Sequence, residues 1–134
     1  MALGFDSTLR NNRLNQITSR AGGSALLRIY SGSRPATAGA ATTLLAQLTC
    51  NATFAPAASS GVLTLNAISP ATSAAATGTA TWFRIVQSDG STFVMDGSVS
   101  TVAAGTGDLR LDDTNIVLGG TVAISSATIT EGNA

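Results

Sequence analysis

The hydrophobic pattern of this 134-residue chain changes its period once, at a pair of glycines. Before Gly22-Gly23, the apolar residues Leu9, Leu14 and Ile17 recur at helical spacing. After the glycines, apolar residues recur at every second position, which is typical of strands with one buried face. The pattern therefore predicts one short N-terminal helix followed by a β domain, with the boundary between residues 23 and 24.

The predicted helix has recognisable ends and an unusual inner face. Asp6 or Ser7 can cap its start, and Gly22-Gly23 allow the left-handed turn that ends many helices. Apolar and cationic side chains share one arc of about 140°, which comprises Leu9, Arg10, Arg13, Leu14, Ile17 and Arg20. Two interpretations stay open: the helix lies on its own sheet with arginine stems covering apolar surface, or it docks on a neighbouring subunit whose carboxylates meet the arginines.

Alternation of apolar and polar residues predicts about eight strands after the helix. Asp89-Gly90 between two β-rich runs predicts a hairpin, and a change of apolar face predicts a bulge or bend near Ser125-Ser126. The large side chains around the hairpin should anchor the core: Trp82, Phe83, Ile85, Phe93, Met95 and Val99. The expected strands cover residues 25–30, 44–49, 63–66, 79–87, 92–98, 109–111, 116–118 and 121–130.

The expected fold is therefore mainly β. Residues 1–23 form an N-terminal arm and short helix, and residues 24–134 form a single β-sandwich or jelly-roll-like domain.

The chain lacks the residues on which most enzymes depend. It has no histidine and no lysine, which removes the commonest general base, the commonest metal ligand and Schiff-base chemistry. Cys50 continues an apolar strand face, so we expect a buried small hydrophobe. Asp108, Asp112 and Asp113 lack the spacing of a known calcium loop and are better explained as turn residues. We expect no enzymatic activity, no catalytic or metal-binding residue and no cofactor.

Charge and apolar runs exclude several partners. Seven arginines balance seven acids, so the basic surface needed for nucleic acid is missing. The apolar runs are much shorter than the roughly 20 residues that span a bilayer, and no secretory signal is evident. With one tryptophan and one tyrosine, a stacking platform for a small ligand is not expected either. A neutral, charge-poor surface suits a subunit of an assembly.

Three stretches resemble a family of small proteins encoded beside the head genes of tailed bacteriophages and prophages. They are residues 27–37 (LRIYSGSRPAT), 78–85 (GTATWFRI) and 94–99 (VMDGSV). The resemblance extends over nearly the whole chain and identifies the family better than its function. Cys50 stands where the family has no special residue. None of the motifs carries a catalytic residue.

The resemblance implies a virion structural protein, most simply a capsid decoration or cement protein. Its partners would be the major capsid protein or other virion subunits, with several copies together on the capsid exterior after assembly in the host bacterial cytoplasm. The alternatives are a neck or tail component, and a non-catalytic receptor- or sugar-binding module. The residues expected at the protein interface are Leu9, Arg10, Arg13, Leu14, Ile17, Arg20 and Arg34.

Overall fold

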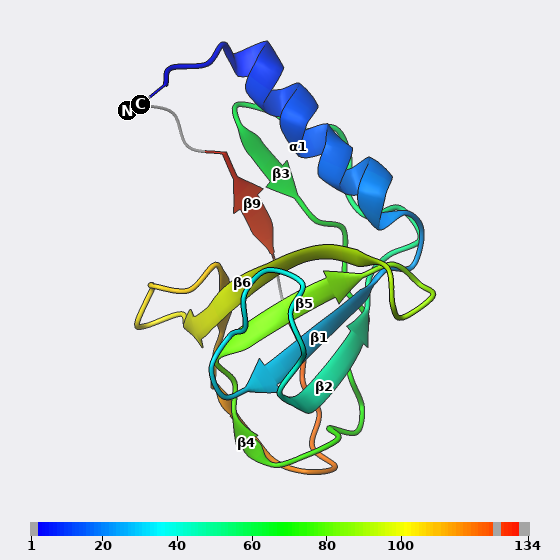
Figure 1. Ribbon diagram of the computed structural model, residues 1–134, viewed down its shortest axis with the longest axis vertical. Coiled ribbons are helices and arrows are strands. Elements are labelled where there is room, and N and C mark those ends of the chain that lie inside the picture. Colours follow the sequence, from blue (N-terminus) through cyan, green and yellow to red (C-terminus); the bar gives the residue numbers. More distant parts are fainter. Residues whose placement is uncertain (1–2, 125–126, 132–134) are drawn as a thin grey trace.

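The computed structural model describes residues 3–124 and 127–131, which form one helix and nine strands (Figure 1). The helix is α1 (Ser7–Ala21). The strands are β1 (Leu26–Ser31), β2 (Thr43–Thr49), β3 (Val62–Thr64), β4 (Gly78–Thr79), β5 (Trp82–Val86), β6 (Phe93–Thr101), β7 (Leu109–Leu111), β8 (Asn115–Ile116) and β9 (Thr128–Thr130).

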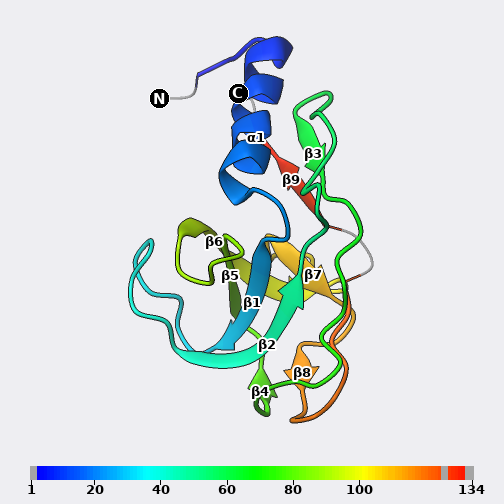
Figure 2. The ribbon, with the colours of Figure 1, turned by 90° about the vertical axis from the view of Figure 1, so that its right-hand side faces the viewer.

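Five of the strands form one curled sheet in the order β2-β1-β5-β6-β7 (Figure 1). Neighbouring strands are antiparallel except β6 and β7, which run parallel. The remaining strands form two short antiparallel ladders, β3 with β9 and β4 with β8. The β3–β9 ladder and α1 lie at one end of the sheet, and the β4–β8 ladder lies at the other end (Figure 2).

The mainly β fold with one N-terminal helix is confirmed. Asp6 caps α1 by accepting hydrogen bonds from the backbone N–H groups of Thr8 and Leu9, at 2.8 and 3.3 Å. Gly22 follows the helix with a positive φ of 69°, which favours glycine. The two-sheet sandwich or jelly roll is not confirmed, because the described residues form one large sheet with two short ladders.

Two of the expected strands do not form single strands in the structure. The run at 79–87 is divided: β4 pairs with β8, the N–H of Ala80 donates to Thr114, and β5 begins only at Trp82. Of the expected strand at 121–130, β9 forms the last part, while Val122 makes an isolated bridge with Ala71. The bend expected at 125–126 lies outside the described residues. The alternation of apolar and polar residues predicts extended backbone, but it does not identify the strand with which that backbone pairs.

The predicted hairpin joins β5 to β6. The carboxylate of Asp89 accepts hydrogen bonds from the N–H groups of Ser91 and Thr92 and from the Thr92 hydroxyl. These bonds stabilise the ionised form and lower the pKa of Asp89 to about 2. Gly90 supplies the positive φ of 77° that the turn requires.

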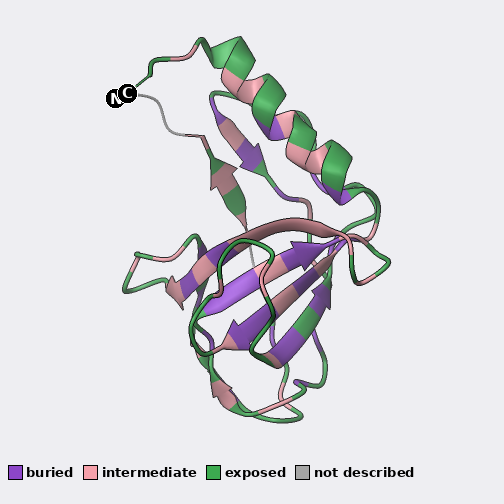
Figure 3. Ribbon diagram, in the orientation of Figure 1, coloured by how far each residue is buried: buried purple, intermediate pink, exposed green. Residues whose placement is uncertain are grey.

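The two faces of the sheet are covered by different parts of the chain. Leu27, Ile29, Phe83 and Ile85 belong to the main core (Figure 3). On the opposite face, the rings of Tyr30 and Trp82 stack with their centres 4.3 Å apart. Trp82, Phe83, Ile85 and Val99 are buried as expected, whereas Phe93 and Met95 are half-buried.

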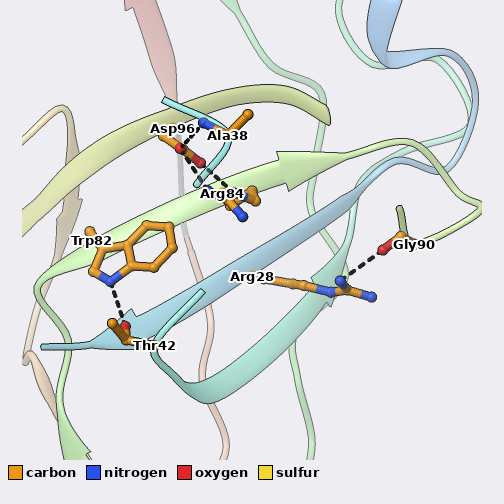
Figure 4. A network of polar contacts seen from close by, with 7 residues as sticks. All are labelled: Arg28, Ala38, Thr42, Trp82, Arg84, Gly90 and Asp96. Carbon is orange, nitrogen blue, oxygen red and sulfur yellow. Dashed lines mark hydrogen bonds and ion pairs between the residues drawn. The ribbon is translucent and has the colours of Figure 1, made fainter. Parts of the chain in front are cut away.

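The connection between β1 and β2, residues 32–42, crosses the Tyr30–Trp82 face (Figure 1). Thr42 accepts a hydrogen bond from the indole N–H of Trp82 at 2.9 Å. The N–H of Ala38 donates to the carboxylate of Asp96 at 3.3 Å (Figure 4). This loop therefore seals an aromatic face that would otherwise be open to solvent.

A nearly buried ion pair lies beside the stacked rings. Arg84 and Asp96 are directly opposite on β5 and β6, and two hydrogen bonds of 2.6 and 2.9 Å join them. Only 11% of the Arg84 side chain and 6% of the Asp96 side chain are exposed. The guanidinium also lies over the rings of Trp82 and Phe93. The hydrogen bond to Asp96 raises the pKa of Arg84 against the opposing effect of burial.

Arg84→Met tests how far the fold depends on this pair. The variant leaves the Asp96 carboxylate nearly buried without its cation, which should lower the free energy of unfolding by about 3–5 kcal/mol. Urea denaturation followed by Trp82 fluorescence measures the change. The exposed Arg110→Met is the control and should shift stability by less than about 0.5 kcal/mol. Equal effects of the two changes would contradict a structural role for the pair.

Candidate protein-interaction site

One face of α1 packs onto the rest of the chain. Leu14 is 2% exposed and Ala21 is 1% exposed, and Ile17 is partly buried against the same core. Arg10 donates two hydrogen bonds, of 3.2 and 2.7 Å, to the backbone carbonyl of Glu131. The helix thus lies on the β3–β9 end of its own chain (Figure 2), as the first interpretation from the sequence expected.

Because of this packing, some of the expected interface residues are not available to a partner protein. Leu14 lies in the core of the chain, where a partner cannot reach it, and Ile17 is largely covered by that core. Arg10 binds a carbonyl of the chain itself. The hydrophobic periodicity located part of the inward face, at Leu14 and Ile17, but it could not show that Arg10 has an intramolecular partner.

Two asparagines outside the predicted arc of the helix also bind the chain. The side-chain carbonyl of Asn11 accepts a hydrogen bond from the N–H of Gly61 at 2.9 Å. That of Asn15 accepts one from the N–H of Ala58 at 2.8 Å. Their spacing of four residues, which aligns side chains on a helix, was the available signal.

The remaining expected helix residues form an exposed strip, which we call the helix flank: Leu9, Arg13 and Arg20. Leu9 is 46% exposed. The Arg13 side chain is 50% exposed, although it pairs with the carboxylate of Glu131 and lies over the ring of Phe5. Arg20 is exposed and donates to the backbone carbonyl of Phe93 at 3.2 Å. An exposed apolar side chain next to arginines has the composition of many protein interfaces.

Arg34 lies apart from this strip, on the exposed connection between β1 and β2. Hydrogen bonds from Ser98 lower the pKa of Asp108, with a smaller contribution from the positive charge of Arg34. The structure therefore gathers three of the seven expected residues on one surface and places Arg34 on another.

A hollow of about 670 Å³ lies between the large sheet and β9. Its apolar lining includes Leu27, Leu65, Phe83 and Ile85. Two carboxylates also line it, but Asp96 binds Arg84 and Asp108 accepts hydrogen bonds from Ser98. Both acids thus have a structural partner.

One of the acids expected to act in turns does so. Asp113 accepts a hydrogen bond from the N–H of Asn115 at 2.8 Å, which is the turn role predicted for it. Within residues 3–124 and 127–131, no group of three acidic, cysteine or histidine side chains could hold a metal ion. In the same residues, no helix has the length and apolar character needed to cross a membrane.

Cys50 is buried, as expected, with 4% exposure. Burial raises the pKa of its thiol to about 11. The reactive thiolate is therefore scarce at neutral pH.

Comparison with known proteins reveals no relative. No family model matches the chain, and neither the curated proteins nor the solved structures include a similar one. The phage family resemblance stays a prediction from the sequence.

Replacing Asn11 or Asn15 by alanine should loosen the helix from the loop at residues 58–61. Each change removes the acceptor of a backbone N–H, which costs about 1 kcal/mol. Urea denaturation measures the loss, and amide exchange at Ala58 and Gly61 should become faster. Asn12→Ala, on the exposed side of the same helix, is the matched control and should change neither quantity. Unchanged exchange in the Asn11 and Asn15 variants would refute their docking role.

Cys50 should resist thiol reagents in the folded protein. At pH 8, reaction with a disulfide reagent should be at least tenfold slower in native buffer than in denaturant, because the thiol is buried and protonated. A Cys50→Ala/Thr49→Cys variant, with its thiol at an exposed position, should react rapidly in both conditions. Rapid labelling of native Cys50 would show that the segment after β2 opens readily.

Proposed function

We propose that this chain is a non-enzymatic structural protein of a tailed-phage virion. In this proposal it acts as a decoration or cement protein on the capsid exterior, where it binds and stabilises the shell of major capsid protein together with further copies of itself. Assembly takes place in the host bacterial cytoplasm. The proposal requires a stiff, mainly β body and does not depend on a jelly-roll arrangement.

The observation that carries the proposal is the helix flank. The other side of α1 is fixed to the chain by Leu14, Arg10 and two asparagines, so the flank is presented on a rigid support. An exposed leucine with two arginines can bury apolar surface and bind carboxylates of a neighbouring subunit. Arg34 and the sparsely charged β1–β2 connection offer a second surface, for contact with the major capsid protein.

The way in which the chain uses its arginines also supports a rigid subunit. Six of the seven form a hydrogen bond or an ion pair within the chain. Arg28, for example, donates to Gln47 on the neighbouring strand. It also donates to the carbonyl of Gly90 (Figure 4). Such a body loses little conformational freedom when it binds, which favours weak contacts repeated by symmetry.

A neck or tail component would use the same kind of surface, so it is kept as the alternative. A receptor- or sugar-binding module is less well supported. Such modules present aromatic rings to their ligands, whereas Trp82 and Tyr30 are 0% and 4% exposed.

Copy number in purified virions of the encoding phage tests the proposal. Quantitative mass spectrometry should give a ratio to the major capsid protein near one, or a simple fraction of it. A few copies per particle would instead support the neck or tail alternative. Complete absence from virions would overturn the proposal.

Binding to particles that lack the protein tests the flank itself. Arg13→Ala/Arg20→Ala should weaken binding at least tenfold, whereas the exposed Arg110→Ala should bind as the unchanged protein does. Circular dichroism and thermal unfolding verify that both variants fold. Full binding by the flank variant would exclude this surface as the contact.

A further inference from the structure

Large apolar side chains that stay exposed gather at the two ends of the long axis of the molecule. Leu3 and Leu9 are 53% and 46% exposed at the α1 end. Val117 and Leu118 are 64% and 63% exposed in the turn after β8, at the opposite end (Figures 1 and 2). Val102, between β6 and β7, is the fifth such residue in the described part of the chain.

The helix and the opposite end of the molecule also differ in charge. On α1, Asp6 caps the helix and Glu131 pairs with Arg13, while Arg20, which lies where the helix meets β6, makes no ion pair within the described residues. At the opposite end, Asp112 and Asp113 are exposed, and residues 111–124 contain no cationic side chain. We call the set of Asp112, Asp113, Val117 and Leu118 the tip.

The tip is concave as well as acidic. A hollow of about 450 Å³ lies between the β7–β8 connection and residues 120–123. Leu111, Ile116 and Val122 contribute apolar lining, and both aspartates also line it. An arginine side chain matches this arrangement, because its stem can lie on the apolar wall while its guanidinium binds carboxylate. Arginine is also the only cationic side chain that this protein possesses.

We propose that the tip of one copy docks on the helix flank of a second copy. Arg20, assisted by Arg13, faces Asp112 and Asp113, and Leu9 packs against Val117 and Leu118. Complementary charge sets the orientation, and the apolar side chains lose their contact with water. Because two different surfaces meet, the contact is heterologous and builds a row or a ring of copies.

This inference goes beyond the virion proposal, because it identifies a second copy as the neighbour at the flank. Purified protein tests it without any particle, so either proposal can fail alone. Both surfaces are small and exposed, so the contact is weak in solution and sensitive to salt, which screens charges beyond about 8 Å at physiological ionic strength.

Sedimentation velocity of the purified chain at low and physiological salt, from micromolar to millimolar concentration, provides the test. Association should increase with protein concentration and weaken with salt. Arg20→Asp and Asp112→Arg should each weaken self-association at least tenfold. An equimolar mixture of these two variants should associate again, to within about threefold of the unchanged protein, because each supplies the charge that the other lacks.

Two further variants complete the design. Arg34→Asp changes net charge as Arg20→Asp does, but on the β1–β2 connection, and should leave association unchanged. Leu118→Ser removes apolar surface from the tip. It should weaken association of the otherwise unchanged protein, and also that of the two charge variants when both carry it and are mixed. A protein that is monomeric at millimolar concentration and low salt would overturn the proposal, and so would a mixture of the charge variants that fails to associate.

Discussion

The need to give buried backbone groups a hydrogen-bonding partner governs much of this structure. Long segments, such as residues 50–61 and 65–77, contain little regular pairing, and an unsatisfied buried N–H or C=O group is costly. Side chains from distant parts of the chain supply some of these bonds. Asn15 binds the N–H of Ala58, and Arg10 binds the carbonyl of Glu131. Polar side chains thus hold together segments that β ladders would join in a more regular protein.

The difference between hydrogen bonds to neighbouring residues and hydrogen bonds to distant ones explains which features could be predicted from the sequence. The α1 cap at Asp6 and the turn at Asp89-Gly90 depend on neighbouring residues, so local patterns found them. The separation of β4 from β5 depends on Thr114, which is distant in sequence. The sequence also did not indicate that β6 and β7 pair in parallel. The connection between them, residues 102–108, is shorter than the roughly dozen residues usual between parallel strands.

The same reasoning applies to the candidate interaction site. The helical period identified part of the side of α1 that faces the core, and Leu14 lies where that period places it. The period carries no information about long polar side chains, which can turn inward or outward from the same position. Arg10 turns to a carbonyl of its own chain, whereas Arg13 and Arg20 stay accessible. Asn11 and Asn15 lie outside the arc that the period defines, yet their amides bind backbone N–H groups of the chain.

The contact between Arg10 and Glu131 joins residues that are 121 positions apart in the sequence. During synthesis, α1 leaves the ribosome before the strands, and β9 and Glu131 follow only after nearly all of the described chain. The helix can contact β3 and the loop at residues 58–61 before that, but the β3–β9 ladder on which it finally lies is still incomplete. Closing so long a loop is also entropically costly, which places the contact between Arg10 and Glu131 late in folding. The side of the helix that faces β9 is therefore open to other partners, including chaperones and newly made copies, until β9 has been synthesised.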